Sequence, residues 1–376
     1  MIRAQLNVHQ QKQNQAISLA SKKRAYGLVE FTLTLVFLVA ALAFSSTIAN
    51  WVNNLSAFWS ATLYFVIMAG AYFLILFPVQ YAKNYRLPKD FGLLKQNFTG
   101  WLGSYVKIPL LTLALGGLAF GLLFGLINAN ANWWWFWAAL AVAAFSFILS
   151  TLFPFWVLPL LYKNHTLPSG ELKRELDLLI SKSKVSLSRV DILEVSSEEE
   201  SANAMLMGWG RNRRLCFSDT LMRDYSIAEI KVITAHELGH AKKGHFGLTW
   251  VVSLLIVMVV LFLTHLLSGL IFRWLDLGEI TALSNMPIIV LLFFVLYSVF
   301  AVLSNFYSRY QERQADLYAL GLTQDPQAFL SMLQKITNQN LEEENPHPLV
   351  EKLLYDHPSS ASRQKMAQAF KPDNPY

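Results

Sequence analysis

The sequence predicts a mostly α-helical, polytopic membrane protein with six transmembrane helices and a split cytoplasmic domain that contains a small β-sheet. The prediction rests on the composition, on six long apolar segments and on the distribution of basic residues. The mean hydropathy is +0.36 and only 15% of the residues are charged, which indicates that much of the chain faces lipid. Cys216 is the single cysteine, so no intramolecular disulfide framework is expected.

Six segments are long and apolar enough to cross a bilayer, since each exceeds the roughly 20 residues that a spanning helix needs. They are 27–49, 58–80, 105–127, 133–161, 246–272 and 286–308. The chain is therefore expected to divide into a cytoplasmic tail, a four-span region, a first soluble piece, a two-span hairpin and a second soluble piece. These five parts are 1–26, 27–161, 162–245, 246–308 and 309–376.

Lys and Arg are distributed unevenly among these parts. The segments 1–26 and 81–104 carry five and four of them, whereas the loops 50–57 and 128–132 carry none. Short loops rich in Lys and Arg remain in the cytoplasm, so both termini and both soluble pieces are predicted there. On this topology 29 of the 31 basic residues lie on one side, and the net charge of +6 reflects membrane orientation. No nucleic-acid partner is expected.

The first soluble piece alternates helix and strand signals. Apolar residues at helical spacing follow Pro168 and Ser169, and the strands are expected at Val190–Val195, Asn203–Met207 and Leu215–Phe217. The turn 208–214 joins the last two strands. The second soluble piece reads as mostly helical.

A His-Glu-Leu-Gly-His run at 236–240 is the strongest functional signal in the chain. On a helix, His236 and His240 share one face, and two imidazoles so placed can bind one zinc ion while Glu237 accepts a proton from zinc-bound water. Ser226 followed by Glu229 predicts a capping box at the start of this helix. The alternative is an ordinary helix with two surface histidines.

The helix is expected to continue almost directly into the fifth span. His240 lies six residues before residue 246, which is about 9 Å on a continuous helix. Glu312 lies four residues after the sixth span, so the two-span hairpin returns it to the same membrane face. A catalytic zinc needs three protein ligands and an open position, and Glu312 is the best third candidate. Asp316, on the same helical face, can hold a ligand imidazole by its second nitrogen; the alternative is a pair of carboxylates on an amphipathic helix, bound to Arg309 and Arg313.

The motifs together resemble those of the type I CAAX prenyl proteases, a family of integral-membrane zinc endopeptidases. They are the run 236–245 (HELGHAKKGH), Glu312 to Asp316 (ERQAD), Asp356-His357-Pro358 with Arg363, and the segments 84–98, 201–204 and 217–221. The resemblance covers most of 80–370. It implies a split, gluzincin-like catalytic domain with one Zn²⁺ per chain.

The resemblance also implies a role for each matching residue. His236, His240 and Glu312 match the zinc ligands, Glu237 the general base, Asp316 the carboxylate behind a ligand, and His357 a histidine that stabilises the oxyanion. Asn203 matches a residue of an edge strand that pairs with the substrate backbone, and Arg363 a supporting arginine. An edge strand can add a peptide as a further strand.

Several histidines, and Asn203, also have a purely structural interpretation. From the residues alone His357 is a turn residue before proline and Asn203 a polar strand end. His347 is expected in a surface loop, His265 buried against a neighbouring helix, and His245 at a helix cap.

Two features of the membrane segments indicate how these helices are placed and packed. The stretch 133–137 (WWWFW) indicates an aromatic belt. Gly117, Gly121 and Gly125 indicate close helix packing, with the lining of an intramembrane chamber as the alternative.

The expected function is that of a zinc metalloendopeptidase that cleaves membrane-associated or lipidated substrates of CAAX type. The eukaryotic enzymes resemble a seven-span design, whereas six spans are visible here, and this favours a bacterial inner membrane over the endoplasmic reticulum. A quality-control protease of loose specificity and a non-proteolytic protein clamped by zinc are the alternatives. The substrate is a peptide or protein, prenylated or not, and the oligomeric state is left open.

Overall fold

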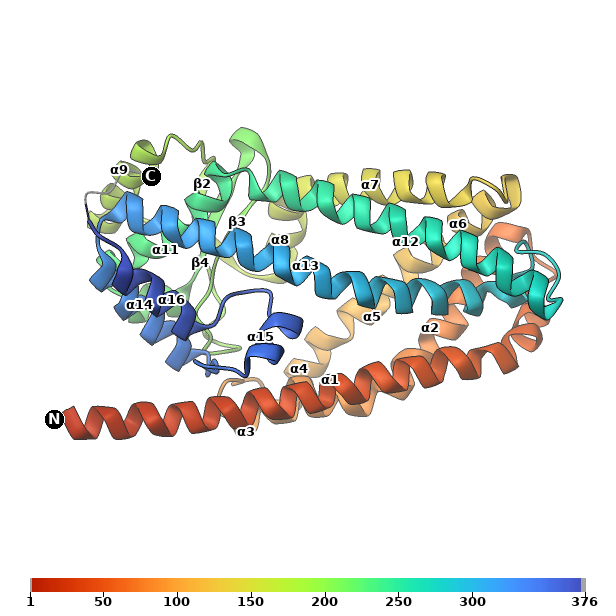
Figure 1. Cartoon of the computed structure of the whole chain (residues 1–376), viewed down its shortest axis with the longest axis horizontal. Helices are drawn as coiled ribbons and strands as arrows, with labels where there is room; N and C mark the ends of the chain where they lie inside the picture. The colour runs from red at the N-terminus through yellow and green to blue at the C-terminus, as the bar shows by residue number, and fades with distance from the viewer. Residues whose placement is uncertain (1, 373–376) are drawn as a thin grey trace.

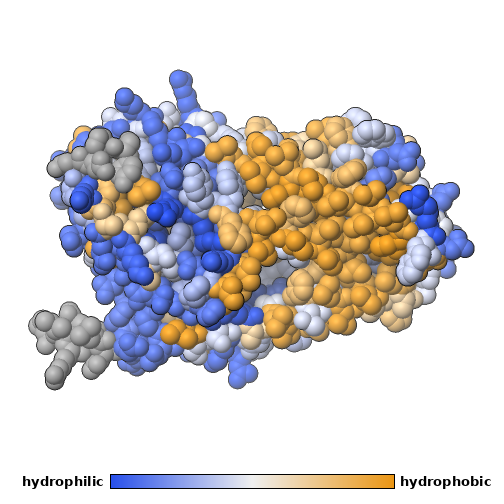
Figure 2. All heavy atoms as spheres, viewed as in Figure 1, coloured by the Kyte–Doolittle hydropathy of each residue, from blue (hydrophilic) through white to orange (hydrophobic). Residues whose placement is uncertain are grey.

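A computed structural model describes residues 2–372, and it is elongated, with the membrane helices at one end and the soluble domain at the other (Figure 1). Six helices are long and apolar enough to cross a membrane, as the sequence predicted. A broad apolar band covers the helical end, and hydrophilic residues cover the opposite end (Figure 2).

The membrane region is built from long helices with local irregularities. They are α1 (Ile2–Val52), α2 (Ala57–Tyr81), α4 (Phe98–Tyr105), α5 (Lys107–Leu111) and α6 (Gly117–Ala129) in one span, α7 (Trp134–Leu152), α12 (His245–Leu275) and α13 (Met286–Thr323). The short helices α3 (Leu87–Asp90) and α8 (Leu158–Leu161) follow the second and fourth spans. Three π-helical turns, at 82–86, 112–116 and 153–157, each lie within a few residues of a proline. Since proline lacks an N–H, the helical hydrogen bonds shift there.

The N-terminal segment is helical and continuous with the first span, because α1 is one 51-residue helix. Its first half packs against the loop after α14 (Pro326–Gln339). Gln13 donates to the carbonyl of Glu342 and accepts from the N–H of Glu344, and Arg24 pairs with Glu343 at 2.6 Å. The expected tail is thus attached to the second soluble piece.

The sheet has four strands in the order β1-β2-β4-β3. They are β1 (Asn164–Thr166), β2 (Arg189–Leu193), β3 (Ala204–Met207) and β4 (Arg214–Ser218). The pair β2–β4 is parallel, and the pairs β1–β2 and β3–β4 are antiparallel. The three predicted strands are confirmed within two residues, β1 was not predicted, and β3 is an edge strand.

The two soluble pieces share one hydrophobic core. The first piece contributes α9 (Glu171–Ser183), α10 (Asp219–Asp224) and α11 (Ile227–Lys242), and the second contributes the end of α13, α14, α15 (Pro348–Leu354) and α16 (Ser360–Ala369). Leu176, Phe217 and Leu238 from the first piece pack with Leu320 and Phe329 from the second, and all five are buried. The split in sequence is therefore closed in space.

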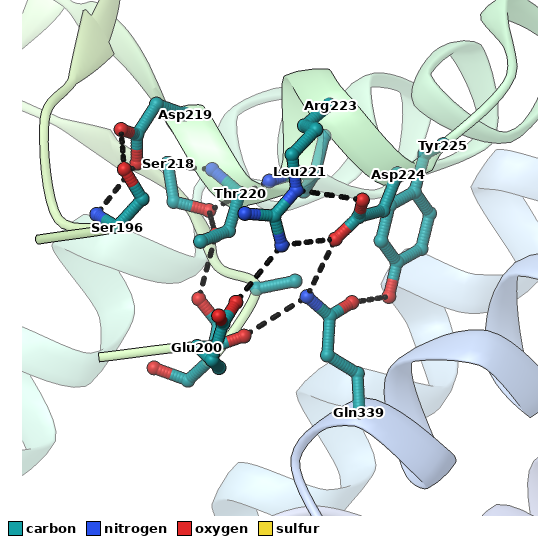
Figure 3. A network of polar contacts seen from close by, with 12 residues as sticks. Ser196, Glu200, Ser218, Asp219, Thr220, Leu221, Arg223, Asp224, Tyr225 and Gln339 are labelled. Atoms are coloured by element: carbon teal, nitrogen blue, oxygen red, sulfur yellow. Dashed lines mark hydrogen bonds and ion pairs between the residues drawn. The ribbon is translucent and has the colours of Figure 1, made fainter. Parts of the chain in front are cut away.

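A polar network also joins the two pieces (Figure 3). The side-chain amide of Gln339, from α14, donates to the carbonyl of Glu200 at 2.9 Å and to Asp224 at 3.2 Å. The amide oxygen of Gln339 accepts from the hydroxyl of Tyr225 at 3.0 Å. Arg223 bridges Glu200 and Asp224 at 2.9 and 2.7 Å. These contacts hold the loop before β3 against the second piece.

Candidate metal centre and catalytic cavity

Helix α11 begins as predicted but ends earlier than expected. The Ser226 hydroxyl accepts from the N–H of Glu229, and the Glu229 carboxylate accepts from the N–H of Ser226, which completes the capping box. The helix leads almost directly into the fifth span, as predicted, but it is not continuous with it, because α11 ends at Lys242 and α12 begins at His245. Gly244 lies between them with φ of 70°, a left-handed conformation that glycine adopts without cost and that ends helices.

Helix α13 crosses α11 at very short distance. A Cβ on Gly239 would lie 3.1 Å from the Cα and 3.2 Å from the carbonyl oxygen of Ala315. Both residues are buried, and Ala315 has 0% exposure. Only a glycine and a small residue allow this approach. It brings the polar residues on either side of Gly239 and Ala315 into contact.

Three predicted ligands meet where the two helices cross. The ligand atoms of His236, His240 and Glu312 lie within 4.8 Å of one another. Nε2 of His240 is 3.1 Å from Nε2 of His236, and the Glu312 carboxylate lies 3.3 Å from His236 Nε2 and 3.4 Å from His240 Nε2. Two imidazoles and one carboxylate are the donor set of a three-ligand zinc site.

The hydrogen bonds around this group favour a cation at its centre. His236 Nδ1 lies 2.9 Å from the Asp316 carboxylate, so in the neutral imidazole Nδ1 carries the proton and Nε2 presents a lone pair. That lone pair faces Nε2 of His240 and the carboxylate of Glu312. Glu312 Oε2 is buried without a hydrogen-bond donor among the described residues. Buried lone pairs that converge in this way are satisfied by a metal ion.

Asp316 and Arg363 support the first histidine from behind. Arg363 donates from Nε and a terminal nitrogen to the two Asp316 oxygens at 2.8 and 2.7 Å, a bidentate pair. Asp316 has 0% exposure. Because the arginine fixes the carboxylate, the carboxylate fixes the orientation and tautomer of His236.

Glu237 lies between the candidate ligands and the edge strand. Its carboxylate accepts from the backbone N–H of Leu206 in β3 at 3.0 Å. Burial raises the pKa of Glu237 above its usual value, against the lowering effect of the nearby histidines and of the Leu206 N–H. A carboxylate with a raised pKa is a more effective proton acceptor near neutral pH.

One cavity, of about 490 Å³, contains most of the predicted residues. Its lining includes Asn203, His236, Glu237, Glu312, His357 and Arg363. His357 Nε2 lies 3.4 Å from Glu312, and its Nδ1 lies 2.9 Å from the Asp356 carboxylate. The exposed side chain of Asn203 precedes β3 at the rim. The second soluble piece thus places His357 on the solvent-exposed side of the three candidate ligands.

His245 has a role in this arrangement that the sequence did not indicate. It is buried, and its Nδ1 lies 3.2 Å from Nδ1 of His240, so it can orient the second candidate ligand. Gln311 donates to the carbonyl of His245 at 3.3 Å and accepts from Thr249 at 2.8 Å. The position of His245 directly after Gly244 was the available signal, since a glycine there can end the helix.

Two other histidines lie away from this group. His265 accepts from the indole N–H of Trp134 at 3.2 Å, so it lies against the neighbouring helix as predicted, but it is only half-buried. His347 is exposed and precedes α15, where its ring accepts from the N–H of Leu349.

A membrane protein with a His-Glu-x-x-His helix and a third carboxylate from a crossing helix falls in the class of membrane metallopeptidases. The chain belongs to peptidase family M48, whose family model matches residues 166–371. The model described as "CAAX prenyl protease N-terminal, five membrane helices" matches residues 3–163. Four of the six candidate membrane helices lie within the described part of that range.

Relatives support the same assignment. The chain is 27% identical to the "CAAX prenyl protease 1 homolog" of Oryza sativa over 76% of this chain and 68% of the relative. It is 26% identical to the "Uncharacterized metalloprotease YhfN" of Bacillus subtilis over 89% of this chain and 80% of the relative. The crystal structure of S. mikatae Ste24p has the same fold, with a TM-score of 0.80 at 21% identity over 94% of this chain and 88% of that one.

Proposed function

We propose that the chain is a zinc endopeptidase whose metal is held by His236, His240 and Glu312. The observation that carries the proposal is the set of converging ligand atoms within 4.8 Å, contributed by two helices that cross at Gly239. When bound, zinc polarises a substrate carbonyl and lowers the pKa of its water to about 7. Cys216 is buried in β4 and is not part of the group.

The protein's own residues then have distinct tasks. Glu237 accepts the proton of the attacking water and returns it to the leaving amine. His357 donates to the oxygen on which negative charge develops, and such a donor typically contributes about 3–4 kcal/mol. Asp316, held by Arg363, keeps His236 in the tautomer that binds the metal.

Strand β3 is the proposed binding edge for the substrate. The carbonyl of Asn203 accepts from the N–H of Ser218, and the N–H of Asn203 donates to the Ser218 hydroxyl. The N–H of Leu206 points the other way, to Glu237. By alternation, the N–H and C=O groups of Ala204 face the open edge. A peptide bound there as an added strand passes Glu237 and the candidate ligands, and Asn203 lies at the end of that edge.

The proposed substrates are membrane-associated peptides, including lipidated peptides of CAAX type. Support comes from the names of the relatives and from the candidate ligands, which lie within a few residues of two membrane helices. A quality-control protease of loose specificity would use the same chemistry on membrane proteins of many sequences. The chain is proposed to act as a multi-pass protein of a bacterial inner membrane with both termini in the cytoplasm.

A structural zinc clamp is the alternative of a different class. Structural zinc sites are usually closed by four protein ligands, whereas this group has three and borders an open cavity. A structural zinc site does not require a general base, so it would give Glu237 no role. These two features favour the protease.

The test is proteolysis by the detergent-purified full chain, with Glu237→Gln as the matched variant. The substrates are a farnesylated CAAX peptide and its unprenylated twin. Cleavage of the farnesylated peptide alone, lost with chelator and reduced at least about 100-fold in the variant, is the expected result. Equal cleavage of both peptides indicates a quality-control protease. Bound zinc without cleavage of either peptide, together with retained cellular function of the variant, indicates the clamp.

A further inference from the structure

A second cavity, of about 710 Å³, lies between the end of α13, α15 and α16. It is distinct from the catalytic cavity, although the two share Pro358 and Arg363 in their walls. Its lining is rich in cations: Arg309, Arg313, Arg363 and Lys365 face Asp316 and Glu351. Arg309 follows the sixth predicted span directly, and Arg313 lies about 6 Å further along the same helix. The cavity is therefore at the level of the lipid headgroups.

Two of the four cationic side chains form hydrogen bonds or ion pairs with other groups of the protein. Arg363 is bound to Asp316. Arg309 donates to the carbonyls of Glu351 and Lys352 in the last turn of α15 and of Tyr355 directly after it. The acidic groups are engaged as well, because Glu351 accepts from the N–H of Ser359 at 2.9 Å.

Arg313 and Lys365 have no such partner. Both side chains are exposed, and neither forms a hydrogen bond or ion pair with any of residues 2–372. Two unpaired cations in one cavity fit a ligand that carries negative charge, and arginine binds phosphate oxygens in a bidentate manner.

Helix α15 adds an apolar surface beside these cations. Leu349, Val350, Leu353 and Leu354 fall within an arc of about 140° at 100° per residue. Leu349, Leu353 and Leu354 are 61%, 46% and 59% exposed. Asn305, within the sixth span, donates to the carbonyl of Leu353 at 2.9 Å, so α15 is attached to the membrane helix itself. In Figure 2 an apolar patch over the position of α15 in Figure 1 borders the apolar band of the membrane helices.

We propose that this cavity binds the phosphate group of an anionic phospholipid, from the leaflet that faces the soluble domain. Arg313 and Lys365 bind the phosphate, and the leucines of α15 lie among the upper acyl carbons. An amphipathic helix with cations beside its apolar face is typical of elements that lie in the bilayer interface. The residues that follow α15, Tyr355 to His357, line the catalytic cavity, so the bound lipid also supports the segment that carries His357.

The test is native mass spectrometry of the delipidated full chain, titrated with phosphatidylglycerol and with phosphatidylcholine of the same acyl chains. The wild type is expected to prefer phosphatidylglycerol. Arg313→Gln and Lys365→Gln should each weaken phosphatidylglycerol binding about fivefold and leave phosphatidylcholine binding unchanged, since one basic residue near an anionic surface has about this effect. The matched controls are Arg174→Gln and Lys182→Gln on α9, whose side chains are exposed and form no hydrogen bond or ion pair within the part of the chain that the structure describes.

Three results would overturn the proposal. They are equal binding of both lipids by the wild type, unchanged phosphatidylglycerol binding in the two cavity variants, and displacement of the lipid by millimolar inorganic phosphate. Thermal unfolding of each variant checks its fold, and both replaced side chains are solvent-exposed. The binding readout does not depend on proteolysis, so failure here is distinguishable from failure of the proposed zinc chemistry.

Discussion

Two helix pairs in this protein use glycine to approach closely, one in the soluble domain and one in the membrane. In α11–α13 a Cβ on Gly239 would meet the backbone of Ala315 at 3.1 Å, and in α2–α6 a Cβ on Gly121 would meet Thr62 Oγ1 at 2.4 Å and the carbonyl of Phe58 at 2.9 Å. The membrane contact packs Gly121 against the ring and backbone of Phe58 and the side chain of Thr62, none of which is ionisable. The soluble contact aligns three ionisable side chains. The same type of close packing therefore supports helix association in one region and the proposed chemistry in the other.

The largest effect is expected for a substitution that removes a candidate ligand at the α11–α13 contact without changing how the two helices pack. Glu312→Gln removes the charge of the third candidate ligand but keeps its shape. We expect zinc affinity to fall at least about 100-fold, more than for loss of a supporting residue, and proteolysis to be lost. Zinc content by mass spectrometry of metals and the melting temperature without metal check this. Full zinc content in the variant would contradict the assignment of Glu312.

The next effect concerns the support behind His236. Arg363→Lys keeps the positive charge but removes the planar pair of donors to Asp316. Zinc affinity is expected to fall about 10-fold, with Asp316→Asn at the larger end of the range of 10 to 100 known for such partners. Competition with a zinc-binding dye measures it. Equal affinity in wild type and both variants would show that Asp316 does not orient the histidine.

Replacement of the glycines sharpens the comparison between the two contacts. Gly239→Ala forces α13 away by a few tenths of an ångström, and proteolysis should fall about tenfold because ligand geometry changes. Gly121→Ala should destabilise the membrane packing by about 1–3 kcal/mol and leave the activity per folded molecule unchanged. Gly125→Ala is the control, since a Cβ added there would meet no atom within 4 Å apart from its own stretch of helix. The comparison fails if Gly121→Ala reduces activity as strongly as Gly239→Ala.

The smallest effect is a pH dependence of stability from Asp219. Burial raises the pKa of Asp219, but the Ser196 hydroxyl and the N–H groups of Val195, Ser196 and Thr220 outweigh it and lower the pKa below the usual value. A lowered folded-state pKa stabilises the fold above the unfolded-state pKa of about 3.9, and the stabilisation is lost as the pH falls through the folded-state value. Melting temperatures from pH 6 to pH 3 should therefore fall more steeply for the wild type than for Asp219→Asn; parallel curves would refute this.

The sequence predicted the six spans, the capping box and three of four strands, because these features depend on local patterns. It missed β1, which has only three residues, and the break at Gly244, since glycine alone does not distinguish a helix end from a helix interior. The role of Gly239 could not be predicted from the sequence either. That residue acts through contact with Ala315, a long-range approach that spacing along one helix does not encode. His245 was missed because its contact with His240 depends on the helix break at Gly244, which the sequence did not predict.

The central claim is that two histidines and one carboxylate, from two crossing helices, hold a single zinc ion with one position open. X-ray absorption at the zinc edge of the purified full chain tests it most directly. The account predicts two imidazole nitrogens and two oxygens at about 2.0–2.2 Å, with one nitrogen fewer in His240→Ala and the fold retained. A sulfur ligand at about 2.3 Å, or an unchanged spectrum in that variant, would contradict it.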